Sequence, residues 1–137
     1  MSIGNYLEFA LERAESDLYR FFDLTLDLLC IATLDGYFKR VNQNFPKVLG
    51  YSEHQLVSEP FINFVHADDV QFTENVVAGL LEGKPVVRFC NRFRHAYGHY
   101  LLLEWTAQSI PSEGSIFAIA RDLTYHRPNF DDDLCRF

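Results

Sequence analysis

The sequence lacks both a long apolar run and an excess of positive charge. No stretch of its 137 residues approaches the roughly 20 consecutive apolar residues needed to cross a bilayer, and the N-terminus lacks the basic start and apolar core of a signal peptide. Lys and Arg number 12 against 19 Asp and Glu, so the net charge of −7 repels nucleic acid and anionic lipid. We therefore expect a cytoplasmic protein that neither binds nucleic acid nor inserts into a membrane.

Cysteine is scarce and the motifs of catalysis are missing. Cys30, Cys90 and Cys135 are odd in number and lack the spacing of a metal site, so we expect reduced thiols. There is no Gly-x-Ser-x-Gly elbow and no Gly-rich phosphate loop, and the five histidines form neither a triad nor a zinc signature. His95 and His99 straddle a turn and are expected to be exposed. We predict no metal site, no catalytic residue and no enzyme activity for this chain.

Aromatic residues are abundant, with 13 Phe, 7 Tyr and 1 Trp. A chain of 137 residues fits one domain, which at that size buries most of its apolar surface. So many rings indicate either a densely packed aromatic core or a core that contains an aromatic-lined pocket.

Apolar residues recur at helical spacing near the N-terminus. Their steps of three and four residues, with charged residues between them, predict an amphipathic helix over residues 3–22. The same spacing is that of a coiled-coil seam, although it extends over about two to three heptads. The helix therefore either docks on the sheet of its own domain or joins two copies into a homodimer. The residues proposed for the dimer contact are Leu7, Leu11, Ala14, Leu18 and Phe21.

Five β-prone runs divide into a pair and a triplet. Residues 28–33 and 37–41 flank an Asp-Gly step, whose glycine adopts the positive φ of a hairpin turn. Residues 86–94, 100–108 and 115–121 are separated by short turns, too short for the crossover connections of a parallel sheet. The sequence thus predicts an α+β fold with a five-stranded antiparallel sheet.

Between the two groups of strands the pattern becomes helical and broken. Gly50 is placed to end one short helix, and Ser52 is placed to cap the next. A longer helix is predicted over residues 69–81, with an acidic pair at its start and Gly83 after its end.

Several segments of the sequence, in the same order, resemble the PAS family, in the version found upstream of bacterial histidine kinases and diguanylate cyclases. The matching segments extend from about Asp27 to Thr124. They are Leu28-Leu29-Cys30-Ile31-Ala32, Asp35-Gly36-Tyr37-Phe38, Asn42 through Leu49-Gly50-Tyr51-Ser52, Phe64-Val65-His66-Ala67-Asp68-Asp69, Leu103-Glu104-Trp105 and Ala120-Arg121-Asp122-Leu123-Thr124.

The resemblance implies a PAS fold with sheet order 2-1-5-4-3 and short helices that enclose a cavity on one face. It divides the chain into an N-terminal helix (1–25), a PAS domain (26–125) and a C-terminal tail or linker (126–137). It also implies a sensory input module that binds a small ligand and signals to an output domain such as a histidine kinase or diguanylate cyclase, as in two-component systems. The alternative is a ligand-free PAS domain that serves in protein–protein interaction and dimerisation.

The candidate cavity residues come from strand alternation and from the resemblance. Alternation places Val87, Phe89, Asn91 and Phe93 on one side of their strand, and it groups Ile116, Ala118 and Ala120 on the last strand. Asn91 would offer a donor and an acceptor among apolar neighbours, unless backbone or water satisfies its amide. Trp105 either lines the cavity or packs outward against the N-terminal helix. The candidate ligand-binding residues are Phe61, Phe89, Asn91, Phe93, Trp105, Ala118 and Ala120.

The resemblance also bears on cofactors. In light-sensing flavin members the position that matches Ala120 carries a glutamine that contacts the flavin, and the position that matches about Phe61 carries the cysteine that forms the adduct. Haem-binding members use a histidine within the long helix, whereas residues 69–81 contain none, and His66 is expected to help cap that helix. The resemblance therefore implies no covalent flavin adduct, argues against haem and leaves the ligand unidentified.

Asp122-Leu123-Thr124 matches the family's Asp-Ile-Thr motif at the exit of the last strand. There the resemblance gives Asp122 and Thr124 a role in signal relay, because their hydrogen bonds fix the outgoing helix to the core. An ordinary helix cap without a signalling role is the alternative. Pro128 limits continuation of a helix beyond this point unless it occupies the first turn.

Overall fold

The structure is a computed structural model that describes residues 3–124. Four α-helices are present in this range: α1 (Ile3–Leu24), α2 (Asn44–Leu49), α3 (Glu53–Val57) and α4 (Val70–Leu81). The strands are β1 (Leu28–Thr33), β2 (Phe38–Val41), β3 (Val86–Arg94), β4 (Tyr100–Ile110) and β5 (Ser115–Asp122). Three short 3-10 turns, η1 (Phe61–Phe64), η2 (Ala67–Asp69) and η3 (Pro111–Glu113), complete the described elements. The tail predicted at 126–137 lies outside the described residues.

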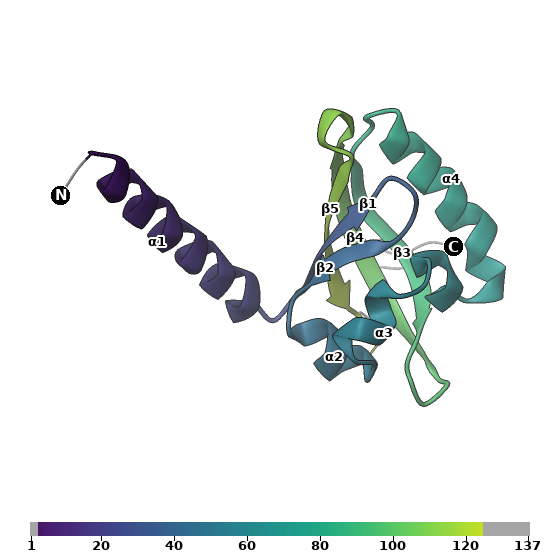
Figure 1. Cartoon of the computed structure of the whole chain (residues 1–137). Helices are drawn as coiled ribbons and strands as arrows, with labels where there is room; N and C mark the ends of the chain where they lie inside the picture. The colour runs from purple at the N-terminus through teal and green to yellow at the C-terminus, as the bar shows by residue number, and fades with distance from the viewer. Residues whose placement is uncertain (1–2, 125–137) are drawn as a thin grey trace.

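The five strands form one antiparallel sheet in the order β2-β1-β5-β4-β3. This confirms the predicted α+β class, the antiparallel pairing and the strand order that the resemblance implies. Helices α4 and α1 lie on opposite sides of the sheet (Figure 1). The face toward α4 is called the inner face below, and the face toward α1 is called the outer face.

The β1–β2 hairpin turns at the predicted Asp35-Gly36 step. Gly36 has φ +95°, a left-handed conformation that glycine adopts without steric cost. Its N–H donates to the Thr33 carbonyl at 3.1 Å, and the Thr33 N–H donates to the Tyr37 carbonyl at 2.8 Å. These bonds close the turn, so the hairpin is confirmed.

Gly50 ends α2 and Ser52 caps α3, as the sequence predicts. Gly50 follows α2 with φ +83°, and a side chain there would lie 2.8 Å from Cε1 of His95, so both the conformation and the space favour glycine. Ser52 and Gln55 form a capping box at α3: the Gln55 N–H donates to Ser52 Oγ at 3.1 Å, and the Ser52 N–H donates to Gln55 Oε1 at 2.8 Å.

The core lies between the inner face of the sheet and the helical middle. Four rings, those of Phe38, Phe45, Phe64 and Phe93, form a continuous cluster with centroid separations of 5.4 to 6.5 Å. All four side chains are buried. Such edge and stacked ring pairs add to the stabilisation from apolar burial. The aromatic abundance of the sequence therefore does form a densely packed core, and a cavity lies next to it.

The alternation predicted for β3 fails at its beginning. Val87 is 70% exposed, whereas Val86 is half-buried and lines the inner face, because the pairing with β4 shifts register between Val86 and Phe89. Arg88, inside this irregularity, has φ +60° and lies 3.7 Å from the Glu104 carboxylate. An extra residue in one strand moves the preceding side chains to the opposite face, and period-two reasoning does not predict where this occurs.

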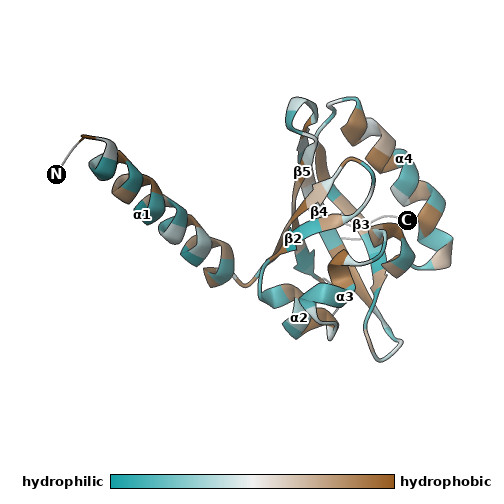
Figure 2. Ribbon diagram, viewed as in Figure 1, coloured by the Kyte–Doolittle hydropathy of each residue, from teal (hydrophilic) through white to brown (hydrophobic). Residues whose placement is uncertain are grey.

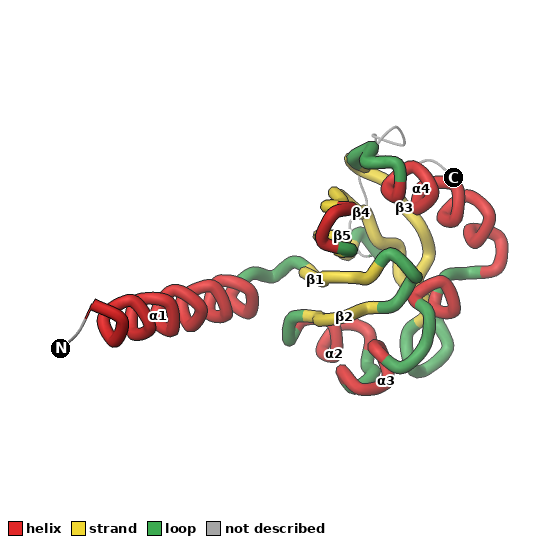
Figure 3. Tube along the Cα trace, turned by 45° about the horizontal axis from the view of Figure 1, so that its top comes forward, coloured by secondary structure: helices red, strands yellow, loops and turns green. Residues whose placement is uncertain are grey.

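Helix α1 is the predicted N-terminal helix, yet none of its residues is buried. Most of it projects away from the rest of the molecule (Figure 3), and hydrophilic and hydrophobic residues alternate along its surface (Figure 2). Near its C-terminal end it contacts β2, where Arg40 Nη1 donates to the Tyr19 hydroxyl at 2.6 Å. The helix therefore does not bury its apolar stripe on its own sheet, and the alternative, contact with a second copy, stays a prediction. Within residues 3–124 no helix is long and apolar enough to cross a membrane.

Candidate ligand cavity

A cavity of about 80 Å³ lies between the inner face of the sheet and α4. The sheet side is formed by inward-facing residues of all five strands, and η1 contributes Phe61. The opposite side is the inner stripe of α4, where Thr73, Val76, Val77 and Leu80 recur at helical spacing. Sheet and helix thus enclose a pocket whose surface is almost entirely apolar.

A chain of three polar side chains crosses this apolar pocket. The Trp105 Nε1–H donates to Asn91 Oδ1 at 2.9 Å, and Asn91 Nδ2 donates to Thr73 Oγ1 at 3.3 Å. Asn91 and Thr73 are buried, with 3% and 6% exposed. Because an indole N–H can only donate, Trp105 fixes which end of the Asn91 amide faces it. These two hydrogen bonds link β4 to β3 and β3 to α4 through the buried amide of Asn91.

Six of the seven residues predicted to contact a ligand meet at this cavity. They are Phe61, Phe89, Asn91, Phe93, Trp105 and Ala118. Trp105, whose direction the sequence left open, points to the inner face, with its ring centroid 6.4 Å from that of Phe45. Ala120 is fully buried but lies outside the lining, paired with Trp105 across β4 and β5. Ligand contact by these residues remains a prediction.

The sequence did not predict that residues of α4 line the cavity. Thr73 and Leu80 are buried, and Val76 and Val77 are half-buried. Their periodicity had indicated a helix with an apolar face, and that signal identifies a core face without saying that the core contains a void. The position of Thr73 in the middle of that stripe was the available signal, because a hydroxyl there needs a buried partner.

The N-terminal end of α4 is fastened to β3 by an ion pair. The Asp69 carboxylate accepts from Arg92 Nε at 2.9 Å, from Arg92 Nη2 at 2.7 Å and from the Arg92 backbone N–H at 2.8 Å. Burial opposes ionisation of Asp69, but these hydrogen bonds and the charge of Arg92 outweigh it and hold the pKa of Asp69 below its ordinary value of 3.8. His66 Nδ1 accepts the Asp68 N–H at 3.0 Å, so it caps the 3-10 turn η2 that precedes α4, and not α4 itself as had been expected.

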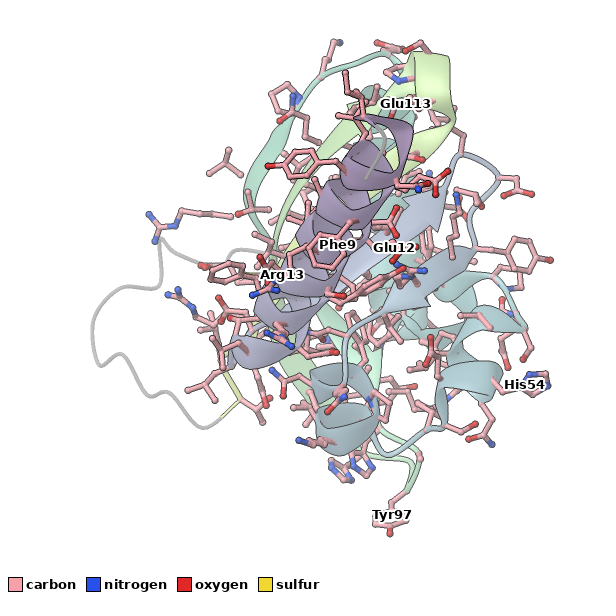
Figure 4. The ribbon with its side chains drawn as sticks, turned by 60° about the vertical axis from the view of Figure 1, so that its left-hand side comes forward. Phe9, Glu12, Arg13, His54, Tyr97 and Glu113 are labelled. Atoms are coloured by element: carbon pink, nitrogen blue, oxygen red, sulfur yellow. The ribbon has the colours of Figure 1, made fainter. Side chains whose placement is uncertain are left out.

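The histidines at the β3–β4 turn lie far from the cavity. His95 and His99 stack with ring centroids 4.3 Å apart, His99 being exposed and His95 half-buried. Partial burial and the charge of His99 lower the pKa of His95. Tyr97 marks the tip of this turn, at the opposite end of the sheet from Glu113 (Figure 4). Residues 3–124 contain no cluster of three or more potential metal ligands.

The cysteines depart in part from the expectation of reduced thiols. Cys30 is a free thiol that lines the cavity, and burial raises its pKa well above the ordinary value. Cys90 is disulfide-bonded, so the expectation is wrong there. The number and spacing of the cysteines did not predict this bond, because pairing depends on which segments the fold brings together. Cys135 lies outside the described residues.

The predicted relay residues are joined to β4. Thr124 donates its N–H to Asp122 Oδ1 at 2.9 Å and its hydroxyl to the same atom at 2.5 Å. The Leu102 N–H in turn donates to Thr124 Oγ1 at 2.9 Å, and the Leu123 N–H donates to the Leu102 carbonyl at 2.8 Å. These bonds fix the direction in which the chain leaves β5. Pro128 lies outside the described residues.

A further set of hydrogen bonds, which the sequence did not predict, joins the end of α1 to the domain. Asn42 Nδ2 donates to the Phe22 carbonyl at 2.9 Å and to the Asp27 carbonyl at 3.0 Å. Asn44 Nδ2 donates to the Asp27 carbonyl at 3.0 Å and also to the Thr25 carbonyl. These two amides, called the asparagine clamp below, satisfy carbonyls at the end of α1 and in the linker that follows it. The clamp therefore sets where α1 begins to leave the domain.

Known proteins resemble this arrangement. The profile of a family described as the PAS fold matches residues 38–120, more than half of the chain. No curated protein matches the sequence. Among solved structures, a domain of a sensory box sensor histidine kinase/response regulator from Geobacter sulfurreducens is 24% identical with a TM-score of 0.69, and the match covers 79% of this chain and 94% of that domain.

Two further solved structures share the fold. The PAS domain of an HTR-like protein from Haloarcula marismortui is 23% identical with a TM-score of 0.71, over 86% of this chain and 98% of that one. The N-terminal domain of a diguanylate cyclase with PAS/PAC sensor from Marinobacter aquaeolei is 15% identical with a TM-score of 0.62, over 72% and 95%. At these identities the structures establish the fold, and the family profile, which matches most of the chain from β2 to β5, establishes the family. The chain belongs to the PAS family of sensory domains.

Proposed function

We propose that this chain is a sensory input module that binds a small ligand in the cavity between the sheet and α4 and signals to an output domain such as a histidine kinase or diguanylate cyclase. The observation that carries the proposal is the polar chain Trp105–Asn91–Thr73 inside an otherwise apolar cavity. Binding pockets combine apolar walls with a few polar groups that orient the ligand. Two structural neighbours are domains of a sensor histidine kinase/response regulator and of a diguanylate cyclase.

The position of Trp105 supports relay through the C-terminal exit. Trp105 pairs with Ala120 across β4 and β5, and two residues further along β5 Asp122 pairs with Leu103. Asp122 holds Thr124, whose hydroxyl accepts from β4. A ligand that moves the Trp105 ring therefore strains the strand pair that ends at the relay residues. The shift is transmitted through contiguous backbone pairing rather than across solvent.

The asparagine clamp supports a second route, through α1. Asn42 belongs to the connection between β2 and α2, and β2 contributes Phe38 to the cavity lining. Displacement of β2 by a ligand would move the clamp and, with it, the end of α1 at Phe22. The clamp acts at one end of a helix 22 residues long, so a small rotation there becomes a large displacement at the far end.

The test of ligand binding uses the protein as purified from cells. Native mass spectra and an absorbance scan are recorded for the wild type, for Ala118→Leu, which fills the cavity, and for Ala118's matched control Ala78→Leu, an exposed site on α4. We expect a co-purifying mass or chromophore that Ala118→Leu reduces and Ala78→Leu retains. A co-purifying mass that Ala118→Leu leaves unchanged, in a folded protein, would show that the ligand lies elsewhere.

A second candidate function is dimerisation through α1 and the outer face. The proposed contact residues Leu7, Leu11, Leu18 and Phe21 are each more than half exposed, at 55% to 70%, and Ala14 is also exposed. A groove of about 920 Å³ lies between α1 and the outer face, where apolar residues of β5 are exposed. Contiguous exposed apolar patches, unlike single exposed apolar residues, mark interaction sites in soluble proteins. A second copy of the chain, carrying the same helix and the same groove, matches it in chemistry.

The dimer is tested by sedimentation velocity on the double variant Leu11→Asp, Leu18→Asp. Its matched control is Arg13→Asp, Ser16→Asp, which adds acidic residues to the same helix at positions outside the proposed contact. We expect the wild type and the control to sediment as dimers and the double variant to sediment as a monomer with an unchanged circular dichroism spectrum. A folded double variant that remains dimeric would rule out contact through α1.

A further inference from the structure

The chemistry of the cavity limits the ligand, if the proposed sensory function is correct. We infer that the cavity takes a small uncharged molecule with a hydrogen-bond acceptor, such as a short-chain ketone, ether or ester, whose acceptor faces Asn91 and Thr73. The inference rests on the proposed function and concerns the class of ligand. Three features of the cavity carry it: its size, the absence of charge in its lining and the direction of its free donors.

Size is the first feature. The cavity of about 80 Å³ is well below the roughly 300–1,000 Å³ of sites that hold drug-sized ligands. The space therefore fits a molecule of a few non-hydrogen atoms.

Enlargement of the cavity is opposed at both ends of α4. Asp69 joins the start of the helix to Arg92 of β3, and the Ser109 hydroxyl of β4 donates to the Leu80 carbonyl at 2.5 Å near its end. Opening the space for a flavin-sized or haem-sized molecule would break one of these attachments. The ion pair is largely buried, because the Asp69 side chain is 5% exposed. Losing a hydrogen bond to such a buried charged group is costly.

Charge is the second feature. None of the residues that line the cavity is Asp, Glu, Lys, Arg or His. In the ion pair that joins α4 to β3, Asp69 and Arg92 already neutralise each other, so this pair supplies no counter-charge for a ligand. An ionised ligand would lose its hydration without gaining a counter-charge, which costs far more than one hydrogen bond returns. Carboxylates and ammonium ions are therefore excluded as ligands.

The free donors are the third feature. Asn91 Oδ1 accepts from Trp105, and one N–H of Asn91 Nδ2 is directed to Thr73 Oγ1. The second N–H of Asn91 and the hydroxyl hydrogen of Thr73 have no acceptor among the described residues. Reversing the amide would direct its N–H₂ group at the indole N–H, so the orientation is determined. The cavity therefore presents two free donors, which a ligand with an acceptor satisfies.

Three probes of one shape test the inference by titration with NMR detection of the Asn91 amide and Trp105 indole signals. Acetone carries an uncharged acceptor, 2-methylpropene replaces its oxygen with a methylene group, and acetate has the same trigonal shape with a charge. Xenon reports entry to the cavity independently of hydrogen bonding. We expect acetone, 2-methylpropene and xenon to bind and acetate to show no saturable shift.

The measured quantity is the Kd of 2-methylpropene divided by that of acetone, because the ratio cancels changes in cavity volume. We expect this ratio to fall about 10-fold in the double variant Asn91→Leu, Trp105→Phe, because it removes the amide donor without leaving the indole N–H free to replace it. Asn75→Leu, an exposed site on the same helix, should leave the ratio unchanged. Thr73→Val removes the hydroxyl but frees the Asn91 N–H that it accepted, so it should leave the ratio close to the wild-type value and is a second control.

The outcomes separate the inference from the proposed function. If xenon and 2-methylpropene enter but the ratio is the same in all variants, the acceptor rule is wrong while the sensory cavity stands. Saturable binding of acetate would overturn the exclusion of charge, and binding of the bicyclic 1-indanone more tightly than acetone would overturn the size limit. If no probe enters, xenon included, the cavity does not take ligands and both proposals fall.

Discussion

Helices α4 and α1 are both amphipathic and lie on opposite sides of one sheet, yet they are held in different ways (Figure 1). α4 buries Thr73 and Leu80 and is fastened to the sheet at both ends. α1 buries no residue and is held by hydrogen bonds near its C-terminal end, at Tyr19, Phe22 and Asp23. An apolar stripe on a helix therefore does not determine what it packs against. On the inner face the stripe closes a cavity within the chain, and on the outer face it remains uncovered.

The largest expected difference between the two faces is in stability. Phe93 on the inner face is 2% exposed and Phe117 on the outer face is 41% exposed, so replacing each by Ala compares one substitution in two environments. Phe93→Ala should lower the free energy of unfolding by about 3–5 kcal/mol, because it removes a ring from the aromatic cluster. Phe117→Ala should lower it by less than about 1 kcal/mol. Urea denaturation of dilute protein measures both.

Equal losses of unfolding free energy in Phe93→Ala and Phe117→Ala would contradict the proposed difference between the two faces. In particular, a loss of several kcal/mol for Phe117→Ala at low protein concentration would mean that the outer face is covered within a single chain. A loss that appears only at high concentration would instead point to a second copy on that face.

The attachment of α4 gives the next effect in size. Asp69→Asn keeps the shape of the side chain but leaves Arg92 without a carboxylate, so the free energy of unfolding should fall by about 1–3 kcal/mol at neutral pH. The pKa of Asp69 is lowered in the folded protein, so the unfolded chain binds the proton first. The contribution is thus fully present above the ordinary value of 3.8 and is lost as the pH falls through the lowered pKa.

The pH dependence supplies the control for this substitution. The difference in unfolding free energy between the wild type and Asp69→Asn should be constant from about pH 7 to about pH 5 and should shrink below pH 4. Urea denaturation at a series of pH values measures it. A difference that stays the same at about pH 2.5 would mean that the variant loses packing rather than an ion pair.

The asparagine clamp at the base of α1 gives a smaller effect. Asn42→Ala removes two hydrogen bonds to carbonyls in and after α1, so we expect a loss of about 1–2 kcal/mol. Its more specific result is a wider range of α1 orientations, measured as the distance distribution between spin labels at positions 11 and 78. Asn63→Ala, an exposed site in η1, should leave that distribution unchanged. An unaltered distribution in Asn42→Ala would remove the clamp as the determinant of helix direction.

The fold could be predicted from the sequence because its signals are local. Turn and cap chemistry places Gly36, Gly50 and Ser52 without knowledge of the tertiary structure, and the order of the strands follows from the resemblance. The bulge at Val87 and Arg88 could not be predicted, since register depends on how β3 pairs with β4. One inserted residue there reverses which side chains face the cavity.

The candidate site was predictable where it lies on strands and unpredictable where it depends on packing. Alternation alone identified Phe89, Asn91 and Phe93 as neighbours on one face. That Trp105 points inward and bonds Asn91 follows from the register of β3 against β4, which the sequence does not contain. The contribution of Thr73 required the three-dimensional position of α4, because a helix stripe shows which residues are buried but not against what.

The smallest expected effect concerns α1 itself and tests the comparison of the two helices most directly. A helix of 22 residues without buried side chains depends on local propensity, so its amide hydrogens should exchange with opening free energies of about 0–1 kcal/mol in dilute protein. Amides of α4 near Thr73 and Leu80 should be protected by several kcal/mol at the same concentration.

Hydrogen–deuterium exchange measured over a range of protein concentrations distinguishes the sources of protection. If a second copy covers α1, its protection rises with concentration while that of α4 stays constant, because mass action stabilises only what the partner contacts. Protection of α1 that equals that of α4 in dilute protein would mean that the helix is held by its own domain, and the distinction between the two faces would be lost.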